Sequence, residues 1–202
     1  MTIDEIKQLV YRVSNTSMSG NVSPEDFNLF LMRTENALYE QLYSEYEKTR
    51  AISDYLSPFK TSQVYMPVPT GSYSYPSDYR HATSFVKYDS NGNETTIEEV
   101  PQDKRANRVN SEVIPIADYP IVVHQYASGF QVIPKLTWVK MYYLKIPTYA
   151  KWGYTIVSGR PVYDSTSSIQ SSFPEALHPD IAIGILKYMG LELTRQELAA
   201  WQ

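Results

Sequence analysis

The three histidines of this chain, His81, His124 and His178, are its best candidates for proton transfer or for binding a metal ion. They lie 43 and 54 positions apart, and no His-x-x-x-His or His-x-His spacing brings two of them together locally. The chain contains no cysteine, which excludes disulfides and thiolate zinc sites. We therefore expect the histidines to be structural, and we predict no catalytic, metal or cofactor site.

Asp78 and His81 lie close to two serines in the sequence, and a hydrolase could be built from these three side-chain types. The serines are Ser77 and Ser84. The alternative is a Pro-Ser-Asp turn that leads into a strand, with Asp78 accepting hydrogen bonds from backbone amides. The sequence has no Gly-x-Ser-x-Gly elbow and no glycine-rich phosphate loop. These patterns favour the turn, and we predict that the protein is not an enzyme.

Two groups of charged residues could take part in binding. Glu98 and Glu99 are neighbours in a predicted strand, so their side chains point to opposite faces and cannot act as one acid–base pair. Lys104, Arg105 and Arg108 form a small basic group on a predicted short helix, which could contact nucleic acid or an acidic neighbour. A solvated helix face is the alternative that we favour, because three charges are a modest patch.

Eighteen tyrosines in 202 residues are the strongest compositional signal, and twelve of them lie between Tyr65 and Tyr163. Tyrosine supplies rigid, amphipathic contact area and is enriched at interfaces. Trp138, Lys140 and Tyr142 share one face of a predicted strand, which could bind a sugar or a protein; the alternative is a sheet face covered by helices. Because the chain has many aromatic residues and few residues of catalytic type, its composition favours a role in protein assembly over a role in catalysis.

Composition narrows the class of protein. A hydrophobic fraction of 43% is close to the globular average, and a chain of this length can bury a real core. The formal charge of -4 gives no support to a general nucleic-acid-binding role. The acidic start of the chain argues against a signal peptide, and no apolar run reaches the roughly 20 residues of a membrane span. We expect a protein made in the cytosol, without a membrane partner or a small-molecule substrate.

Helical periodicity marks both ends of the chain. Residues 2–5 have the spacing of a capping box, and Ser23-Pro24 predicts the start of a second helix that breaks near Ser44. Pro179 favours the start of a helix that Gly190 ends, and a second capping box then opens a last short helix.

The middle of the chain has the alternation and turn signals of strands. The predicted hairpins pair 80–88 with 94–100 around an Asn-Gly turn, 121–126 with 130–133, and 154–157 with 160–163. The prolines near 64–68 predict an edge strand, 137–146 reads as a further strand, and 101–109 reads as a short helix.

These elements predict an α+β fold. The N-terminal and C-terminal helices are expected to pack together as a helical bundle, because each needs a partner for its apolar face. A central antiparallel β-rich region of hairpins is expected to form a small sheet or sandwich. The predicted parts are residues 1–60, residues 61–174 and residues 175–202.

Several segments, taken in order, resemble a known family. They are NVSPEDFNLFLMRTENALYE, ISDYLSPFK, YPSDYRHATSFVKY, IPIADYPIV, VKMYYLKIPTYAKWGYTIV and PVYDSTSSIQSSFPEALHPDIAIGILKYMGLELTRQEL. The chain resembles virion structural proteins of crAss-like and related tailed phages of Bacteroidetes. It departs from the expected pattern at 169–174, where an acidic, tryptophan-bearing stretch would be expected.

The resemblance implies a head-to-tail connector: a ring subunit or portal adaptor in the phage neck. It implies a homo-oligomeric ring of twelve subunits that contacts the portal and other neck or tail proteins, assembled in the host cytoplasm and carried in the virion. Genomic DNA would pass through the channel without specific binding. A carbohydrate- or protein-binding module of a phage fibre or surface adhesin is the second hypothesis, and the hydrolase is the third. The sequence leaves open whether Lys104, Arg105 and Arg108 contact DNA or protein.

Overall fold

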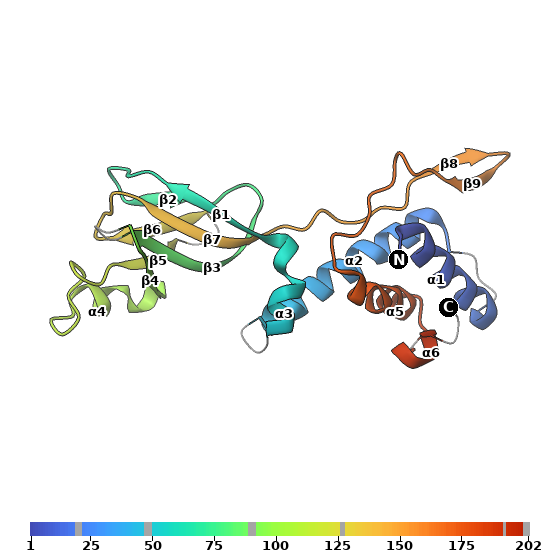
Figure 1. Ribbon diagram of the computed structural model, residues 1–202, viewed down its shortest axis with the longest axis horizontal. Coiled ribbons are helices and arrows are strands. Elements are labelled where there is room, and N and C mark those ends of the chain that lie inside the picture. Colours follow the sequence, from blue (N-terminus) through green and yellow to red (C-terminus); the bar gives the residue numbers. More distant parts are fainter. Residues whose placement is uncertain (19–21, 47–49, 89–91, 126–127, 192, 200–202) are drawn as a thin grey trace. The chain divides into compact units, whose positions relative to one another are not determined.

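The chain forms two compact units, one inserted into the sequence of the other. The computed structural model describes residues 1–18, 22–46, 50–88, 92–125, 128–191 and 193–199 (Figure 1). Unit 1 comprises Met1–Pro58 and Pro147–Gln202, and unit 2 comprises Phe59–Ile146. The α+β class is confirmed. Residues 147–174, predicted as part of the β-rich middle, belong by their contacts to unit 1.

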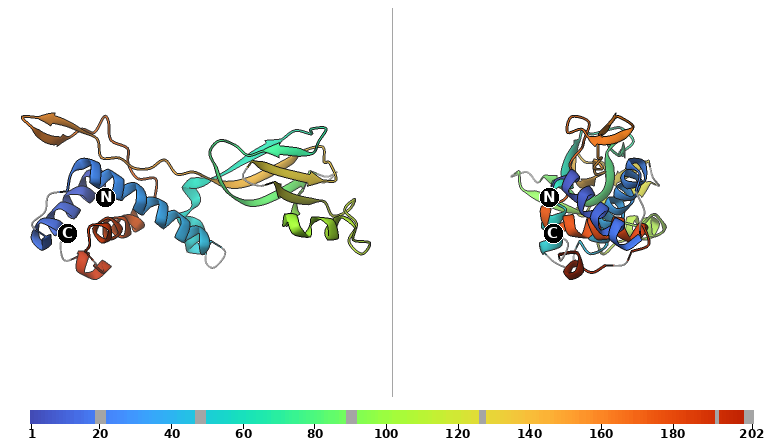
Figure 2. Two further views of the ribbon diagram at one scale, coloured as in Figure 1. Left: turned by 180° about the vertical axis from the view of Figure 1, so that it is seen from behind. Right: turned by 90° about the vertical axis from the view of Figure 1, so that its right-hand side faces the viewer.

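Unit 1 is built from the helices of the two chain ends. They are α1 (Ile3–Met18), α2 (Pro24–Ser44), α3 (Arg50–Tyr55), α5 (His178–Tyr188) and α6 (Arg195–Ala199). Helix α5 contacts α1, α2 and α6, and it lies beside α1 and α2 in the views of Figures 1 and 2. Ile6, Leu31 and Ile185, one from each of the three longest helices, are fully buried. The apolar stripes that the sequence places on these helices therefore form the core of unit 1.

The helix ends follow the predicted capping signals. Ser23 Oγ accepts a hydrogen bond from the Asp26 amide at 3.1 Å, and Thr2 and Glu5 cap each other at 3.2 and 2.7 Å. Gly190 follows α5 with φ +85, a conformation that glycine adopts without strain. The predicted starts of α1 and α2 and the end of α5 are confirmed.

An extended segment from Tyr149 to Tyr154 lies along α2 and is held by polar side chains of that helix. Four positions of the segment bond to four positions of the helix in antiparallel order: Tyr149 to Asn36, Ala150 to Glu35, Trp152 to Asn28 and Tyr154 to Glu25. Asn28 makes two bonds to the Trp152 backbone, at 2.8 and 3.1 Å. This set of contacts is the physical reason that 147–174 belongs to unit 1.

The segment and the helix match in length. The five steps of extended chain from Tyr149 to Tyr154 span about 17 Å. The eleven steps of helix from Glu25 to Asn36 also span about 17 Å. From each bonded residue of the segment to the next, the bonded helix residue therefore lies one, seven and three positions further back along α2, and neither element has to bend.

Beyond this segment, the chain forms an isolated hairpin of β8 (Tyr154–Val157) and β9 (Arg160–Tyr163). The predicted pairing is confirmed, with Ser158 and Gly159 at positive φ in the turn. The two strands form a sheet of their own, and Figure 2 shows them projecting from the helices of unit 1.

Unit 2 is one curled, mostly antiparallel sheet of seven strands. They are β1 (Lys60–Tyr65), β2 (Ser72–Ser74), β3 (Tyr79–Tyr88), β4 (Glu94–Val100), β5 (Ile121–Gln125), β6 (Gly129–Ile133) and β7 (Val139–Lys145). The spatial order is β1-β7-β3-β4-β5-β6-β2, so β1 is an edge strand. It overlaps the edge strand predicted near 64–68 only at Val64 and Tyr65, and the prolines behind that prediction, Pro67 and Pro69, lie beyond its end. The β3–β4 and β5–β6 hairpins are also confirmed. The predicted turn residues Ser90 and Asn91, and Tyr126 at the end of the second hairpin's first strand, lie outside the described residues.

One strand pair departs from the expected antiparallel arrangement: β4 and β5 are parallel. The connection between them contains a 3-10 turn (Gln102–Lys104) and α4 (Arg105–Val109), which confirm the short helix predicted at 101–109. Parallel neighbours need a crossover of a dozen or more residues, and residues 101–120 provide it. The length of this connection therefore permits the parallel pairing, which a tight hairpin turn could not make.

Aromatic rings fill the core of unit 2. Phe85 and Phe130 are fully buried with ring centroids 4.8 Å apart, and Tyr65 meets Phe130 edge-on at 5.0 Å. Tyr75 and Tyr79 stack at 3.9 Å against this cluster. Part of the tyrosine content thus serves the core, where the rings supply apolar area. The Tyr75 hydroxyl bonds to His124, whereas the Tyr65 hydroxyl is buried without a hydrogen-bond partner among the described residues.

Candidate functional site

A groove in unit 1 gathers charged and aromatic side chains from α1, the start of α2 and the β8–β9 hairpin. Its volume is about 780 Å³, within the range of ligand-binding clefts. The lining residues are Asp4, Lys7, Gln8, Tyr11, Arg12, Val22, Ser23, Pro24, Trp152, Arg160 and Pro161. Asp4, Gln8 and Arg12 lie four positions apart on α1, as do Lys7 and Tyr11, so helical spacing places both rows beside the groove.

Trp152 and Lys7 form the centre of the groove. The Lys7 ammonium lies 3.5 Å from the centroid of the Trp152 ring, a cation–π contact. The Trp152 indole donates to Asp4 at 2.9 Å, and the same carboxylate accepts from the Gln8 amide at 2.7 Å. Burial lowers the pKa of Lys7, and the nearby Asp4 carboxylate partly opposes this. Lys7 is therefore a partly desolvated cation on an aromatic surface.

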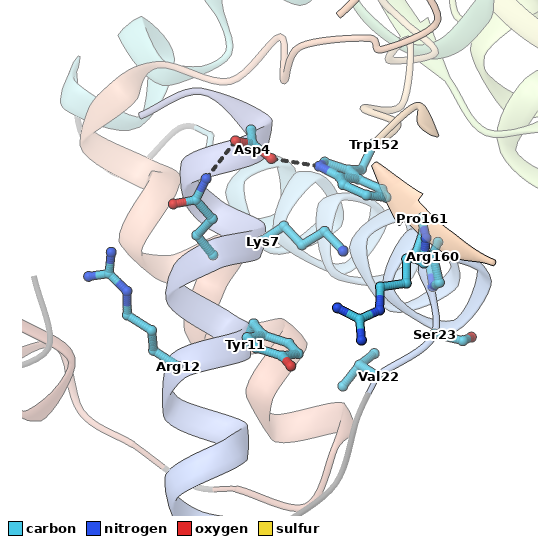
Figure 3. Close-up of a pocket in the computed structure, with 11 residues that line it drawn as sticks. Asp4, Lys7, Tyr11, Arg12, Val22, Ser23, Trp152, Arg160 and Pro161 are labelled. Carbon is cyan, nitrogen blue, oxygen red and sulfur yellow. Dashed lines mark hydrogen bonds between the residues drawn. The ribbon is translucent and has the colours of Figure 1, made fainter. Parts of the chain in front are cut away.

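The remaining cations come from two directions (Figure 3). Arg160, from β9, extends toward Lys7 and Tyr11, whereas Arg12 extends from the other side of α1. The side chain of Arg160 has no hydrogen bond or ion pair to any residue that the structure describes, and its backbone pairs with Val157 in the hairpin. The sequence did not reveal this groove, because α1 and β9 are about 150 positions apart. The one sequence feature that could have indicated a binding surface here was an arginine in a hairpin with three exposed aliphatic residues.

The residues of the hydrolase hypothesis lie at the start of β3. The Tyr79 amide donates to the Pro76 carbonyl at 3.1 Å, which confirms the predicted turn. The Asp78 carboxylate accepts a hydrogen bond from the Tyr143 hydroxyl at 2.9 Å, a side-chain donor where backbone amides were expected. The backbone of His81 pairs with Leu144 in the sheet. The contacts of Asp78 position the β3–β7 pair.

Of the three histidines, His124 has side-chain partners that the sequence did not indicate. It bonds to the Tyr75 hydroxyl through Nδ1 and to Glu99 through Nε2, the latter at 2.8 Å. Burial is the main cause that raises the pKa of Tyr75. Because Tyr75 also stacks on Tyr79, this row of polar groups fixes the edge of the aromatic core. The partners come from positions 25 and 49 residues away, so no local spacing could reveal them.

His178 is buried at the start of α5. Its Nε2 donates to the Phe173 carbonyl at 3.1 Å, which ties the end of the 147–174 segment to the helix. Glu98 and Glu99 have different partners, Arg108 and His124, as expected for neighbours on opposite faces of a strand.

In the basic group at 104–108, Arg108 bonds to other residues of unit 2, whereas Lys104 is exposed to solvent. Arg108 donates to Glu98 at 2.7 Å and to the carbonyls of Ile114 and Tyr119 at 2.6 and 3.2 Å. It therefore organises the connection between β4 and β5, and its side chain is nearly covered. Lys104 is exposed, and Arg105 is half-buried.

The aromatic face predicted on β7 has neighbours from β3 and β4. Lys140 donates to Glu94 at 2.9 Å, and the Tyr142 hydroxyl donates to the same carboxylate at 2.8 Å. Trp138 packs on Tyr88 with ring centroids 3.6 Å apart. The hydrogen bonds from Lys140, Tyr142 and Tyr88 hold the pKa of Glu94 below its usual range. The result is a preorganised polar and aromatic surface.

No protein-family model matches this chain, and no curated protein matches it either. Within the described ranges, no group of three or more His, Cys, Asp or Glu side chains could hold a metal ion. No helix in the described part of the chain is both long and apolar enough to cross a membrane.

Proposed function

We propose that the protein is a structural subunit of a ring in the neck of a tailed phage, between the portal and the tail, that encloses the DNA channel. The resemblance of its segments to neck proteins of crAss-like phages supports this role. In this proposal the helical bundle of unit 1 is the scaffold, and the hairpin and unit 2 reach neighbouring subunits and neighbouring rings.

The observation that carries the proposal is the β8–β9 hairpin. Ile156, Val157 and Val162 have exposed fractions of 62%, 54% and 47%. A two-stranded hairpin is marginally stable alone in water, and clustered exposed aliphatic side chains mark contact surfaces. In a closed ring, each subunit presents one surface to the preceding copy and a different one to the next. We infer that the hairpin is the first of these surfaces and that its partner is a second copy.

The test is the oligomeric state of the full chain, alone and with the portal protein encoded by the same genome. Native mass spectrometry and negative-stain imaging are expected to show a ring of twelve subunits. Val157 and Val162 lie on one face of the hairpin, so the double variant V157D/V162D is expected to abolish the ring without changing the helical circular dichroism. Ser165→Asp, an exposed change in the same segment, is the matched control.

Two results would count against this function. One is a wild-type chain that stays monomeric in the presence of the portal. The other is assembly of V157D/V162D into the same ring as the wild type.

A second function, a carbohydrate- or protein-binding module of a fibre or adhesin, is favoured by the Tyr88–Trp138 pair beside Lys140 and Glu94. Sugars stack on exposed aromatic rings and bond to fixed polar groups. Glycan binding by the wild-type chain that Trp138→Ala removes would support it. The absence of glycan binding together with ring formation would exclude it in favour of the connector.

A further inference from the structure

The groove of unit 1 is cationic although the unit that carries it is acidic. Unit 1 contains fourteen Asp and Glu residues and nine Lys and Arg residues. The centre of the groove reverses this balance, with Lys7 and Arg160 against Asp4 alone. The Asp4 carboxylate already accepts hydrogen bonds from Trp152 and Gln8. The concave surface therefore has a local positive charge that the rest of the unit does not share.

Two of the cations face the same space. Figure 3 shows the Lys7 side chain extending toward Trp152 and the Arg160 guanidinium extending toward Tyr11, and both line the same groove. Like charges that converge repel each other unless an anion lies between them. Within the part of the chain that the structure describes, Arg160 has no acidic partner, and the face of Lys7 turned to Trp152 is met by a ring. The charge of the pair is thus available to a ligand.

Apolar surface flanks the two cations. The Tyr11 side chain has an exposed fraction of 43%, and Val22 and Pro161 line the groove on either side. A ligand that fits must therefore present an anionic group next to apolar groups. Guanidinium groups bind carboxylates with paired hydrogen bonds, so a glutamate or aspartate side chain with apolar neighbours meets both requirements.

We propose that this groove binds an acidic, partly apolar segment of a protein partner, with a carboxylate between Arg160 and Lys7 and apolar side chains on Tyr11 and Pro161. The inference does not rest on the proposed ring, because a monomeric protein could use the groove in the same way. Nucleic acid fits less well, because its affinity comes from several phosphate contacts along a basic track. The unit around the groove is acidic and would repel such a polymer.

The experiment measures binding of a short fluorescein-labelled peptide of alternating Glu and Leu to the full-length protein by fluorescence anisotropy. A peptide with Gln in place of Glu is the ligand control, and inorganic phosphate and a short single-stranded DNA are competitors. Arg160→Gln is expected to weaken binding by about tenfold, the loss of one charge-assisted contact. Lys187→Gln, an exposed cation on α5 outside the groove, is expected to leave binding unchanged.

Each outcome decides the proposal. Selective binding of the Glu peptide that Arg160→Gln weakens and Arg160→Lys partly restores would support it. No binding, equal binding of the Gln peptide, or equal loss in Lys187→Gln would overturn it. Displacement of the peptide by phosphate or DNA at lower concentration than by unlabelled peptide would also overturn it, in favour of a phosphate site. Circular dichroism of each variant separates loss of binding from loss of fold, and ring formation is scored independently.

Discussion

At the scale of single residues, the buried carboxylate of Glu35 links two parts of unit 1 that are distant in sequence. It lies on α2 and accepts hydrogen bonds from the Ala150 amide at 2.7 Å and the Ser171 hydroxyl at 2.6 Å. Burial raises the pKa of Glu35, although these two bonds oppose the change. A raised pKa means that the folded state holds its proton more tightly than the unfolded state does. The stability that this proton contributes is therefore full below the unfolded pKa and is lost as pH rises through the folded pKa.

Glu35→Gln should remove this pH dependence while keeping both hydrogen bonds, because the amide can accept from Ala150 and donate to Ser171. We expect the free energy of unfolding of the wild type to fall relative to the variant as pH rises from about 4.5 toward neutrality. Urea unfolding across this range measures the difference. Glu112→Gln, an exposed change in unit 2, shows the general effect of losing one charge. If the free energies of unfolding of the wild type and Glu35→Gln changed with pH in parallel, Glu35 would not have a raised pKa in the folded state.

At the scale of elements, the crossing of α2 and α5 depends on a glycine. A Cβ added to Gly184 would lie 2.4 Å from Cγ2 of Thr34, a buried residue of α2. The two helices therefore approach closely only because residue 184 has no side chain.

Gly184→Ala should destabilise unit 1 by roughly 1–2 kcal/mol, since overpacking outweighs the gain in helix propensity. Thermal unfolding followed by circular dichroism measures the loss. Thr34→Ala in the same chain should restore most of it, because it removes the methyl group that clashes and a buried hydroxyl that has no hydrogen-bond partner among the described residues. Failure of the double variant to recover would mean that the helices are held apart by something else.

Helices and strands were predictable where their sequence signals depend on residues only a few positions apart. Alternation and Ser-Gly turns located β8 and β9, and capping residues located the helix starts, because these depend on neighbours within a few positions. The attachment of 149–154 to α2 was not predictable, since its partners are polar residues more than 100 positions away. The parallel β4–β5 pair was missed for a related reason: pairing direction is set by the path of 101–120 as a whole.

The candidate groove was hidden in the same way. The sequence pattern gave no role to Lys7 or Tyr11, and Trp152 fell within the predicted β-rich part, 61–174. Only the attachment of the 149–154 segment to α2 brings Trp152 and Arg160 to α1. A long-range arrangement of polar contacts thus creates the site, and composition alone indicates no more than a surface for assembly.

At the scale of the whole molecule, unit 2 is an insertion whose two ends meet. Lys60, at the start of β1, is the register partner of Leu144, at the end of β7. Neighbouring strands lie about 5 Å apart, so the chain leaves unit 2 beside the point where it enters. Unit 1, in contrast, takes its core from both chain ends, with α1 and α2 before the insertion and α5 after it. The two units should therefore fold on separate sets of contacts.

Replacing 59–146 with a linker of about four Gly and Ser residues should leave unit 1 folded, because a short linker spans the gap between the paired ends. The helical circular dichroism and a cooperative thermal transition should persist in the shortened chain. The excised fragment 59–146 should fold separately with a β-sheet spectrum. In the proposed ring, the shortened chain keeps the β8–β9 hairpin and should still form the twelve-subunit contact. A shortened chain that loses its helices would show that unit 1 needs unit 2 to fold, and a folded but monomeric one would place the ring contact in unit 2.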